Sequence, residues 1–339
     1  MKKLAVTMGD PGGVGPEIVI KALSSPEIRK QYVPVVIGDV SVIHDALTLL
    51  KLPLRLRTIK SPEESRQDGG SISIIYMPPP ERPFEKGRSS DFPKRVYIKN
   101  RPSAEGGRAC ASYIKKAVEL ALNKEVDGIV TAPISKEALK MAGYGWPGHT
   151  EMLADLTHTK DFSMMLVGGP LKVILVTIHT ALKNVPGLIT KQRIVKTIRL
   201  AARACDMLGI KKPEIAVAGL NPHAGESGIF GDEEIKKIVP AVRQAMKEGI
   251  PVSGPYPPDT VFHKAFKGEI DIIVCMYHDQ GLIPLKMIAF DKGVNVTVGL
   301  PFIRTSPDHG TAFDIAWKGI ADPSSMIEAI KLAVKLRNS

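Results

Sequence analysis

Short apolar runs rich in β-branched residues alternate along this chain with segments whose apolar residues recur at helical spacing. The runs predict strands at Leu4–Met8, Val33–Ile37, Ile72–Tyr76, Gly128–Thr131, Lys172–Ile178, Glu214–Gly219, Ile270–Met276 and Val294–Val298. Between them, in segments such as Cys110–Leu122, apolar residues return every three or four positions, as in a helix with one buried face. Strands that alternate with helices are typical of βαβ units and of a largely parallel sheet covered on both faces. The sequence therefore predicts an α/β fold.

The length of the chain and its proline- and glycine-rich stretch indicate how it is divided into domains. At roughly 150 residues per domain, a chain of 339 residues predicts two domains. The stretch Ser61–Arg101 carries Pro78-Pro79-Pro80 and Gly69-Gly70, which favour an irregular excursion between regular elements. Because no linker marks a domain boundary, we expect the chain to pass between the domains more than once.

The chain carries a net charge of +11, from 46 lysines and arginines against 35 aspartates and glutamates. The cations are spread along the sequence in short pairs such as Lys115-Lys116 and Lys236-Lys237, and only 5% of the residues are aromatic, which leaves few rings to stack on bases. We interpret the charge as solvated helix faces. Attraction of a small anionic substrate is the second interpretation, and a nucleic-acid-binding module is a rival hypothesis. No nucleic-acid partner is expected.

Cysteine usage and hydropathy predict a cytoplasmic protein. Cys110, Cys205 and Cys275 form no CxxC motif and cannot all pair, which favours a reducing compartment. The apolar run at the N-terminus is too short for a signal peptide. The longest unbroken apolar stretch, Ile272–Tyr277, is far shorter than the roughly 20 residues that a membrane span needs. No membrane partner is expected.

Three histidines lie at or just beyond the carboxyl ends of predicted strands. His179 follows KVILVTI, His223 lies in AVAGLNPHAGE and His278 in DIIVCMYHDQG. Parallel strands would bring the three imidazoles to one rim of a sheet, and imidazole is the commonest ligand of transition metals. Three histidines that leave coordination positions open are typical of a catalytic metal site. Each histidine alone is better explained as a satisfied polar residue at a strand end, but the three together predict a metal site.

Two further motifs have both functional and structural interpretations. Asp259, in GPYPPDTVF, is a fourth metal ligand, a general base or simply an N-cap. His149 and Thr150 precede a predicted helix at Met152–Leu156, and a helix N-terminus can bind phosphate through its free N–H groups and its dipole. The alternative is that Thr150 only caps that helix.

Lys286, Asn295 and Arg304 lie around the last predicted strand. A lysine point charge and an arginine fork suit recognition of phosphate and carboxylate, although each residue alone fits a surface cation or a solvated polar group. The glycine-rich segment Gly9–Ile18 follows a predicted strand, and its glycines allow close approach of backbone to a ligand. A GxGxxG pattern at Gly143–Gly148 follows an apparent helix rather than a strand, so it fails the requirement for a Rossmann fingerprint.

Taken together, these motifs resemble one family, the 4-hydroxythreonine-4-phosphate dehydrogenases with their relatives, the 4-phospho-D-threonate and 4-phospho-D-erythronate dehydrogenases. The resemblance covers essentially the whole chain and rests on seven ordered motifs: GDPGGVGPEI (Gly9–Ile18), TAPISKEAL (Thr131–Leu139), PGHTE (Pro147–Glu151), NPHAGE (Asn221–Glu226), PPDTVF (Pro257–Phe262), YHDQG (Tyr277–Gly281) and GLPFIRTSPDHGTAFDIA (Gly299–Ala316). The features that lean towards the phospho-threonate branch are Trp146-Pro147, Gly228–Glu234, Ile283 and Trp317.

The resemblance implies roles for particular residues. One divalent metal ion per subunit, with Zn²⁺, Co²⁺, Mn²⁺ and Mg²⁺ as candidates, would be held by His179, His223 and His278. The implied substrate contacts are His149, Thr150, Lys286, Asn295 and Arg304. The loop HGTAFDIA is similar to the adenosine-binding loop of isocitrate and isopropylmalate dehydrogenases, so NAD, with NADP as the second candidate, is expected at His309, Gly310, Thr311, Ala312 and Asp314.

The resemblance also implies an architecture similar to that of isocitrate and isopropylmalate dehydrogenases, with two α/β/α domains and the active site in the cleft between them. We expect a discontinuous cofactor-side domain of residues 1–140 plus 286–339, and a metal, substrate and dimerisation domain of residues 141–285. A homodimer is implied, with the active site at the subunit interface, so that both chains can contribute ligands to one metal.

The implied reaction is NAD-dependent, metal-assisted oxidation at C3 of a four-carbon 4-phospho-3-hydroxy acid, followed by decarboxylation. The first expectation is conversion of 4-phospho-D-threonate or 4-phospho-D-erythronate to dihydroxyacetone phosphate and CO₂. The alternative is conversion of 4-hydroxy-L-threonine 4-phosphate to 3-amino-2-oxopropyl phosphate in pyridoxal 5′-phosphate biosynthesis. Lys286 is the candidate proton donor to the enolate, with pairing to phosphate or carboxylate as its other role. A metal-dependent hydrolase that uses no NAD is a rival hypothesis.

Overall fold

The computed structural model describes residues 1–66, 70–78 and 97–338, so much of the predicted excursion at Ser61–Arg101 lies outside the described residues. The chain divides into two compact units, unit 1 of residues 1–158 and 304–334 and unit 2 of residues 159–303 and 335–339. The main crossings therefore lie at 158/159 and 303/304, whereas the sequence prediction set them at 140/141 and 285/286. Two packing facts explain the difference: the helices up to residue 156 pack on a long helix of unit 1, and the strand at 294–298 pairs with a strand of unit 2.

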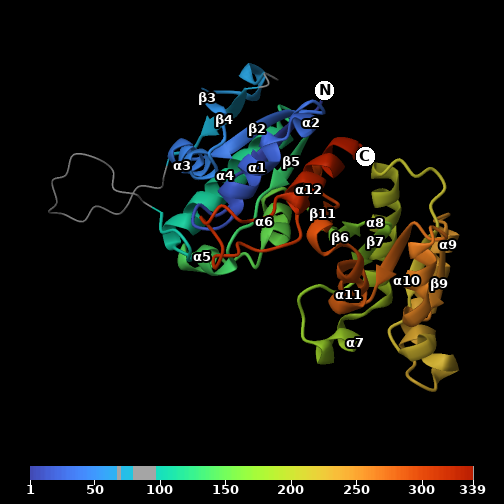
Figure 1. Ribbon diagram of the computed structural model, residues 1–339. Coiled ribbons are helices and arrows are strands. Elements are labelled where there is room, and N and C mark those ends of the chain that lie inside the picture. Colours follow the sequence, from blue (N-terminus) through green and yellow to red (C-terminus); the bar gives the residue numbers. More distant parts are fainter. Residues whose placement is uncertain (67–69, 79–96, 339) are drawn as a thin grey trace. The chain divides into compact units, whose positions relative to one another are not determined.

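Unit 1 is built on strands in the order β3(Arg55–Ile59), β4(Ser71–Tyr76), β2(Val33–Gly38), β1(Lys3–Thr7), β5(Gly128–Thr131) and β12(Ile303–Pro307). The neighbours from β3 to β5 are parallel. The accompanying helices are α1(Gly15–Ser24), α2(Pro26–Arg29), α3(Val40–Leu50), α4(Ala104–Leu122), α5(Lys136–Met141), α6(His149–Leu156) and α12(Ser324–Lys335), with a 3-10 turn η1(Pro62–Glu64). The red helix α12 in Figure 1 lies with the blue and green elements of this unit, and the Thr305 hydroxyl donates to the Ala329 carbonyl at 2.8 Å.

Unit 2 has strands in the order β11(Val294–Val298), β6(Ser163–Gly168), β7(Leu171–Leu175), β10(Ile272–Cys275), β8(Ile215–Ala218) and β9(Val252–Tyr256). β7, β10, β8 and β9 are parallel, and β6 is antiparallel to both of its neighbours. The longer helices are α8(Lys191–Met207), α9(Val239–Lys247), α10(Pro258–Phe266) and α11(His278–Ala289), and the short ones are η2(Leu182–Asn184), α7(Val185–Leu188), η3(Pro222–Gly228), η4(Glu234–Ile238) and η5(Phe290–Lys292). Apolar residues of β7, β8 and β10 form a buried core with α10 and α11.

The predicted α/β class with a mostly parallel sheet is confirmed. Each predicted strand is present, with ends that differ by a few residues; the run Lys172–Ile178, for example, is a strand only as far as Leu175. None of the helices in the described part of the chain has the length and apolar character that crossing a membrane requires.

Four strands were not predicted, each for a physical reason. β12 is fully buried although its sequence is IRTSP, because its polar side chains are hydrogen-bonded inside the unit. β6 and β7 form a hairpin across Gly169-Pro170, two apolar runs joined by a short turn. β9 contains Gly254-Pro255, a pair that argues against a strand, and it lies at an edge of the sheet, where proline is tolerated. β3 is an edge strand whose sequence, RLRTI, has no continuous apolar run.

The glycine-rich turn after β1 contains a buried carboxyl group. Asp10 is 1% exposed, and its Oδ1 accepts a hydrogen bond from the Gly12 N–H at 2.9 Å, while Oδ2 is buried without a hydrogen-bond partner. Burial raises the pKa of Asp10 to about 6, and the Gly12 hydrogen bond only partly opposes this. The same turn is anchored by the Val14 N–H, which donates to the Thr311 carbonyl at 2.9 Å. Ionisation of Asp10 therefore opposes folding of this part of unit 1.

Asp10 predicts a pH dependence of stability. The pKa of Asp10 is higher in the folded chain than in the unfolded chain. Its contribution to the free energy of unfolding is therefore fully present below the ordinary pKa of aspartate, and it is lost as the pH rises through about 6. Asp10→Asn keeps the acceptor for Gly12 and removes the charge. We expect the free energy of unfolding of the wild type to fall relative to that of the variant by up to about 3 kcal/mol between pH 4 and pH 7, with no further change above that range. Urea unfolding of both proteins measures the difference, and a difference that is the same at every pH would contradict the assignment.

Candidate functional site

Three neighbouring parallel strands of unit 2 end at the same edge of the sheet. β10 pairs in parallel with β7 on one side and with β8 on the other. Thr177, just after β7, donates from its N–H at 3.2 Å and from its hydroxyl at 2.7 Å to the carbonyl of Met276, just after β10. Gln280 is buried, accepts from the Met276 N–H at 2.7 Å and donates to the Gly219 carbonyl after β8 at 2.7 Å. These bonds hold the ends of the three strands together.

His179 and His278 lie beside each other at this edge. Their ring centroids are 5.6 Å apart and the rings are tilted by 42°. Nδ1 of His278 is 2.7 Å from Oδ1 of Asp279. A carboxylate on one ring nitrogen fixes the tautomer and leaves Nε2 as the metal-binding atom. Since metal–nitrogen distances are about 2.0–2.1 Å, two imidazoles on one ion stand with centroids roughly 5 to 6 Å apart. The pair therefore fits a shared cation.

His223, the third predicted ligand, is not brought together with this pair. It lies in η3, where five consecutive residues from His223 to Ser227 have positive φ between 42° and 82°. Such backbone is costly for residues other than glycine and is found mostly at functional sites. Within the described part of the chain, no group of three or more His, Cys, Asp or Glu side chains is arranged to hold a metal ion. Two of the three predicted ligands thus form a pair, and the third needs another arrangement to join them.

The loop that carries His223 is held by a glutamate that sequence reasoning did not single out. Glu234, 2% exposed, accepts through Oε1 from the N–H groups of Leu220 and Asn221 at 2.7 and 2.8 Å, and through Oε2 from Nδ2 of Asn221 at 2.9 Å. The only sequence signal was its place in the motif GIFGDEE. A buried carboxylate with three donors is a stable anchor, so Glu234 fixes the base of the loop.

Asp259 lies in the first turn of α10 and is exposed. The N-cap of this helix is Pro257, so the N-cap interpretation of Asp259 was wrong. Its place in the first turn suits the positive end of the helix dipole. It belongs to no metal-binding group within the described residues, and a role as base remains a prediction.

His149, Thr150 and Arg304 belong to unit 1. α6 begins at His149 with Gly148 as its N-cap, which excludes Thr150 as the cap and starts the helix earlier than predicted. Thr150 is 3% exposed and Arg304 1% exposed. Arg304 Nη2 donates to the Thr131 hydroxyl at 2.7 Å. Nε2 of His149 is buried without a hydrogen-bond partner.

Burial and proximity shape the charges of this cluster. The pKa of His149 is held well below its usual range by burial of the ring and by the nearby Arg304 guanidinium, so the imidazole is neutral. Burial lowers the pKa of Arg304 to about 9, partly opposed by the carboxylate of Glu151. A buried cation next to a buried, unpartnered ring nitrogen at a helix N-terminus is a strong site for an anion.

Lys286 and Asn295 belong to unit 2. Lys286 is half-buried on α11, with Nζ 5.5 Å from the centroid of the Phe290 ring. Asn295 lies on β11, and its Oδ1 is buried without a hydrogen-bond partner. The predicted substrate residues are thus divided between the units, three in unit 1 and two in unit 2.

The residues predicted to bind the cofactor form the loop after β12. Thr311 is buried, and its carbonyl accepts from Val14 of the glycine-rich turn, so the two segments pack together. His309, Gly310 and Asp314 are exposed, with Nδ1 of His309 3.0 Å from the Gly310 carbonyl oxygen, and Ala312 has a φ of 40°. The loop is accessible and held at its base, as a binding loop requires.

A second glutamate missed by sequence reasoning holds the end of this loop. Glu17 on α1 is fully buried, and its carboxylate accepts from the N–H groups of Trp317 and, at 2.8 Å, Gly319. The indole N–H of Trp317 donates to the Pro11 carbonyl at 3.0 Å, and Nζ of Lys99 lies 3.8 Å from the centroid of a Trp317 ring. The only signal for Glu17 in the sequence is that an acidic residue is typical of the first turn of a helix.

Comparison with known proteins shows the family of the chain. Residues 30–333 match the family described as "Pyridoxal phosphate biosynthetic protein PdxA". A 4-hydroxythreonine-4-phosphate dehydrogenase from Desulforapulum autotrophicum is 46% identical over 331 residues, which are 97% of this chain and 94% of that protein. A D-threonate 4-phosphate dehydrogenase from Salmonella typhimurium is 46% identical over 338 residues, 99% of each chain. The crystal structure of a 4-hydroxythreonine-4-phosphate dehydrogenase from Klebsiella pneumoniae has a TM-score of 0.87 at 44% identity and covers 98% of each chain. The chain therefore belongs to the PdxA family and is a dehydrogenase, an oxidoreductase that acts on a CH–OH group.

Proposed function

We propose that the chain uses NAD, with NADP as the second candidate, and a divalent metal ion to oxidise C3 of a four-carbon 4-phospho-3-hydroxy acid, which then loses CO₂. The first candidate substrate is 4-phospho-D-threonate, or 4-phospho-D-erythronate, with dihydroxyacetone phosphate as product. The alternative is 4-hydroxy-L-threonine 4-phosphate, with 3-amino-2-oxopropyl phosphate as product. Relatives at 46% identity bear names of both kinds, so the names alone do not choose between them.

The observation that carries the proposal is the buried cluster of His149, Thr150 and Arg304. Burial of a guanidinium that is 1% exposed carries a desolvation cost, and a phosphate or carboxylate would offset part of it through charge-assisted hydrogen bonds. The neutral imidazole of His149 can donate a hydrogen bond to the same anion when its proton lies on Nε2. A phosphorylated acid fits this chemistry, and its phosphate held there would fix the position of C3.

The reaction divides into two balanced steps. In the first, the hydride on C3 passes to the nicotinamide and the C3 hydroxyl loses its proton, which gives a 3-keto acid. In the second, the C1–C2 bond breaks, CO₂ leaves, and C2 of the resulting enolate takes up a proton. A divalent cation, when bound, would supply Lewis-acid stabilisation of the negative oxygen. Lys286 is the proposed proton donor to C2, and Asp259 the proposed base.

The histidine pair supports the metal part of the proposal. His179 and His278 have the spacing of two ligands of one ion, and Asp279 orients His278. His223 is proposed as the third ligand. Because it is separate from the pair in this chain, we propose that a second copy of the chain completes the site.

We propose that the second copy contacts an apolar surface formed by α11 and the turn η5 that follows it. Ile283 and Met287 on α11 and Phe290 of η5 lie four and three residues apart and are 59%, 83% and 72% exposed. Large apolar side chains that share an exposed face mark a protein–protein interface. The surface is on the helix that begins with His278, so a homodimer formed through it would bring a second copy to the metal ligands. We therefore propose that the protein is a homodimer.

The substrate is tested by following NADH absorbance with three compounds in parallel: 4-phospho-D-threonate, 4-phospho-D-erythronate and 4-hydroxy-L-threonine 4-phosphate. We expect kcat/KM to be highest for one of the first two. Preference for the third would select the alternative substrate. Release of inorganic phosphate without NADH formation would instead support a metal-dependent hydrolase and overturn the proposal.

The metal site predicts a graded series of variants. Because the lost ligand contacts the ion directly, His278→Ala should weaken Co²⁺ binding by more than about 100-fold, whereas Asp279→Asn should cost about 10- to 100-fold, as outer-shell partners do. His223→Ala should abolish both metal binding and turnover, with the circular dichroism spectrum unchanged. Titration with Co²⁺, followed by its visible absorption, measures the affinity. The control is His263→Ala, an exposed histidine on α10; wild-type affinity in His278→Ala would contradict the assignment.

The anion cluster predicts a change in substrate affinity. Arg304→Gln keeps a donor for the Thr131 hydroxyl and removes the positive charge. Since a hydrogen bond to a charged group contributes about 1.5–3 kcal/mol, KM should rise about ten- to hundredfold. Steady-state kinetics give the value, with Arg101→Gln, an exposed arginine of the same unit, as control. If the two variants have the same KM, Arg304 does not bind the substrate.

A further inference from the structure

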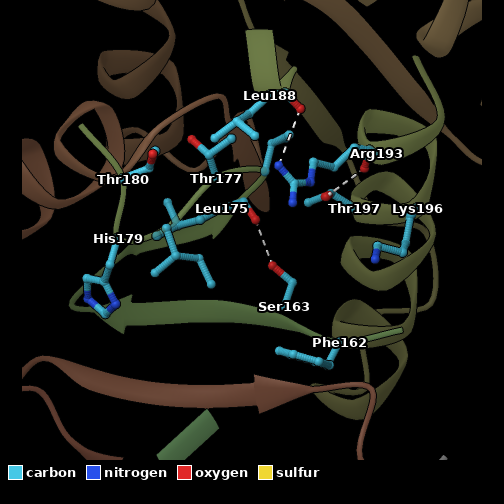
Figure 2. Close-up of a pocket in the computed structure, with 12 residues that line it drawn as sticks. Phe162, Ser163, Leu175, Thr177, His179, Thr180, Leu188, Arg193, Lys196 and Thr197 are labelled. Atoms are coloured by element: carbon cyan, nitrogen blue, oxygen red, sulfur yellow. Dashed lines mark hydrogen bonds between the residues drawn. The ribbon is translucent and has the colours of Figure 1, made fainter. Parts of the chain in front are cut away.

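Unit 2 contains a pocket of about 390 Å³ that the proposed reaction does not use, apart from His179 at its rim. Figure 2 shows it between the strands and α8, with Ser163 and Leu175 on the strand side and Arg193, Lys196 and Thr197 on the helix side. This volume is in the range of sites for small metabolites, about 300–1,000 Å³.

The charges that line this pocket have one sign. Arg193 and Lys196 lie one turn apart on α8, and His179 is at the opposite side. No aspartate or glutamate belongs to the described residues that line it. Lys196 is 3.4 Å from Oδ1 of Asp161, but both side chains are well exposed, at 37% and 72%. An exposed ion pair of this kind contributes little, so Lys196 can turn towards a ligand at small cost.

The position of these cations on α8 is itself unfavourable. Helices place acidic residues in their first turn, where the dipole is positive. α8 is 17 residues long, begins Lys191-Gln192-Arg193 and has no acidic residue in that turn. Its N-cap, Thr190, accepts from the Arg193 N–H at 3.2 Å, and Nη1 of Arg193 donates to the Leu188 carbonyl at 3.3 Å, which holds the guanidinium near the helix start. An anion would offset the repulsion between these cations and the dipole.

The walls of the pocket are mixed. Leu175 and Val176 are apolar and buried, and several hydroxyl-bearing residues line the pocket beside them. The hydroxyls of Thr177 and Ser163 already donate to the carbonyls of Met276 and Leu175, each at 2.7 Å. The charged donors for a ligand therefore come from Arg193 and Lys196 on α8.

We propose that this pocket is a second anion site, which binds a small dianion, either a phosphate group or a dicarboxylate, through Arg193, Lys196 and the N-terminal turn of α8. Its residues belong to unit 2, whereas the cluster of His149, Thr150 and Arg304 belongs to unit 1. The proposed site does not depend on the proposed reaction, because the charges and positions of Arg193 and Lys196 are the same for any substrate of the enzyme.

Equilibrium dialysis of the full chain against radiolabelled inorganic phosphate tests the proposal, with malonate in a second series as the dicarboxylate. The variant is Arg193→Gln with Lys196→Gln. The matched control is Lys211→Gln with Lys212→Gln, which removes the same charge from two exposed lysines in the loop after α8. We expect the wild type and the control each to bind one more phosphate per chain than the pocket variant does. If the pocket variant still binds that phosphate, we expect its affinity to be at least tenfold weaker. The preferred anion follows from which of the two series shows the larger difference.

The count also separates this proposal from the proposed function. If the cluster in unit 1 binds phosphate as well, the wild type binds two and the pocket variant one; if that cluster does not, the numbers are one and zero. Equal binding by the wild type and the pocket variant in both series would overturn the second site. Circular dichroism and melting temperature confirm that the variants fold, since both altered side chains project from one face of a helix whose buried residues are unchanged.

Discussion

The parallel pairing of β10 with β7 and β8 is the constraint on which the proposed metal site depends. Parallel neighbours must end at the same edge of a sheet, so the segments that follow them meet there whatever their distance in sequence. Gln280 and Met276 then fix the three ends to one another through buried hydrogen bonds. Since a buried polar group that loses its partner costs about 1–3 kcal/mol, these strand ends cannot separate cheaply. The rigid edge sets the distance between His179 and His278, and the orientation of His278 is then completed by Asp279.

The anion cluster of unit 1 depends on a different constraint, the burial of polar residues on β12. A strand of sequence IRTSP has little apolar surface, yet all five residues are buried. The fold tolerates this because Arg304 bonds to Thr131 on β5 and Thr305 bonds to the backbone of α12. These bonds hold Arg304 in one place before any ligand arrives. Preorganisation of this kind would reduce the entropy that binding of the proposed anion must overcome.

Much of this could be predicted from the sequence, and the failures have identifiable causes. Period and composition were sufficient for the α/β class, because buried parallel strands are continuous apolar runs. They were also sufficient to place three histidines at strand ends. Neither kind of evidence predicts β12, because its burial depends on tertiary hydrogen bonds. Neither predicts the roles of Glu17 and Glu234, because their carboxylates accept from backbone groups distant in sequence. His223 lies in η3, whose left-handed backbone no spacing rule reveals.

The net charge illustrates how far composition alone can lead. A value of +11 is compatible with solvated helices, with a small anionic ligand or with nucleic acid. What distinguishes these is where individual cations lie. Lys211 and Lys212 are exposed, whereas Arg304 is enclosed in protein and Arg193 lies at the positive end of a helix dipole. The surroundings of Arg304 and Arg193 carry an electrostatic cost that a bound anion would reduce. This is why the proposed anion sites are built on these cations and not on exposed ones such as Lys211 and Lys212.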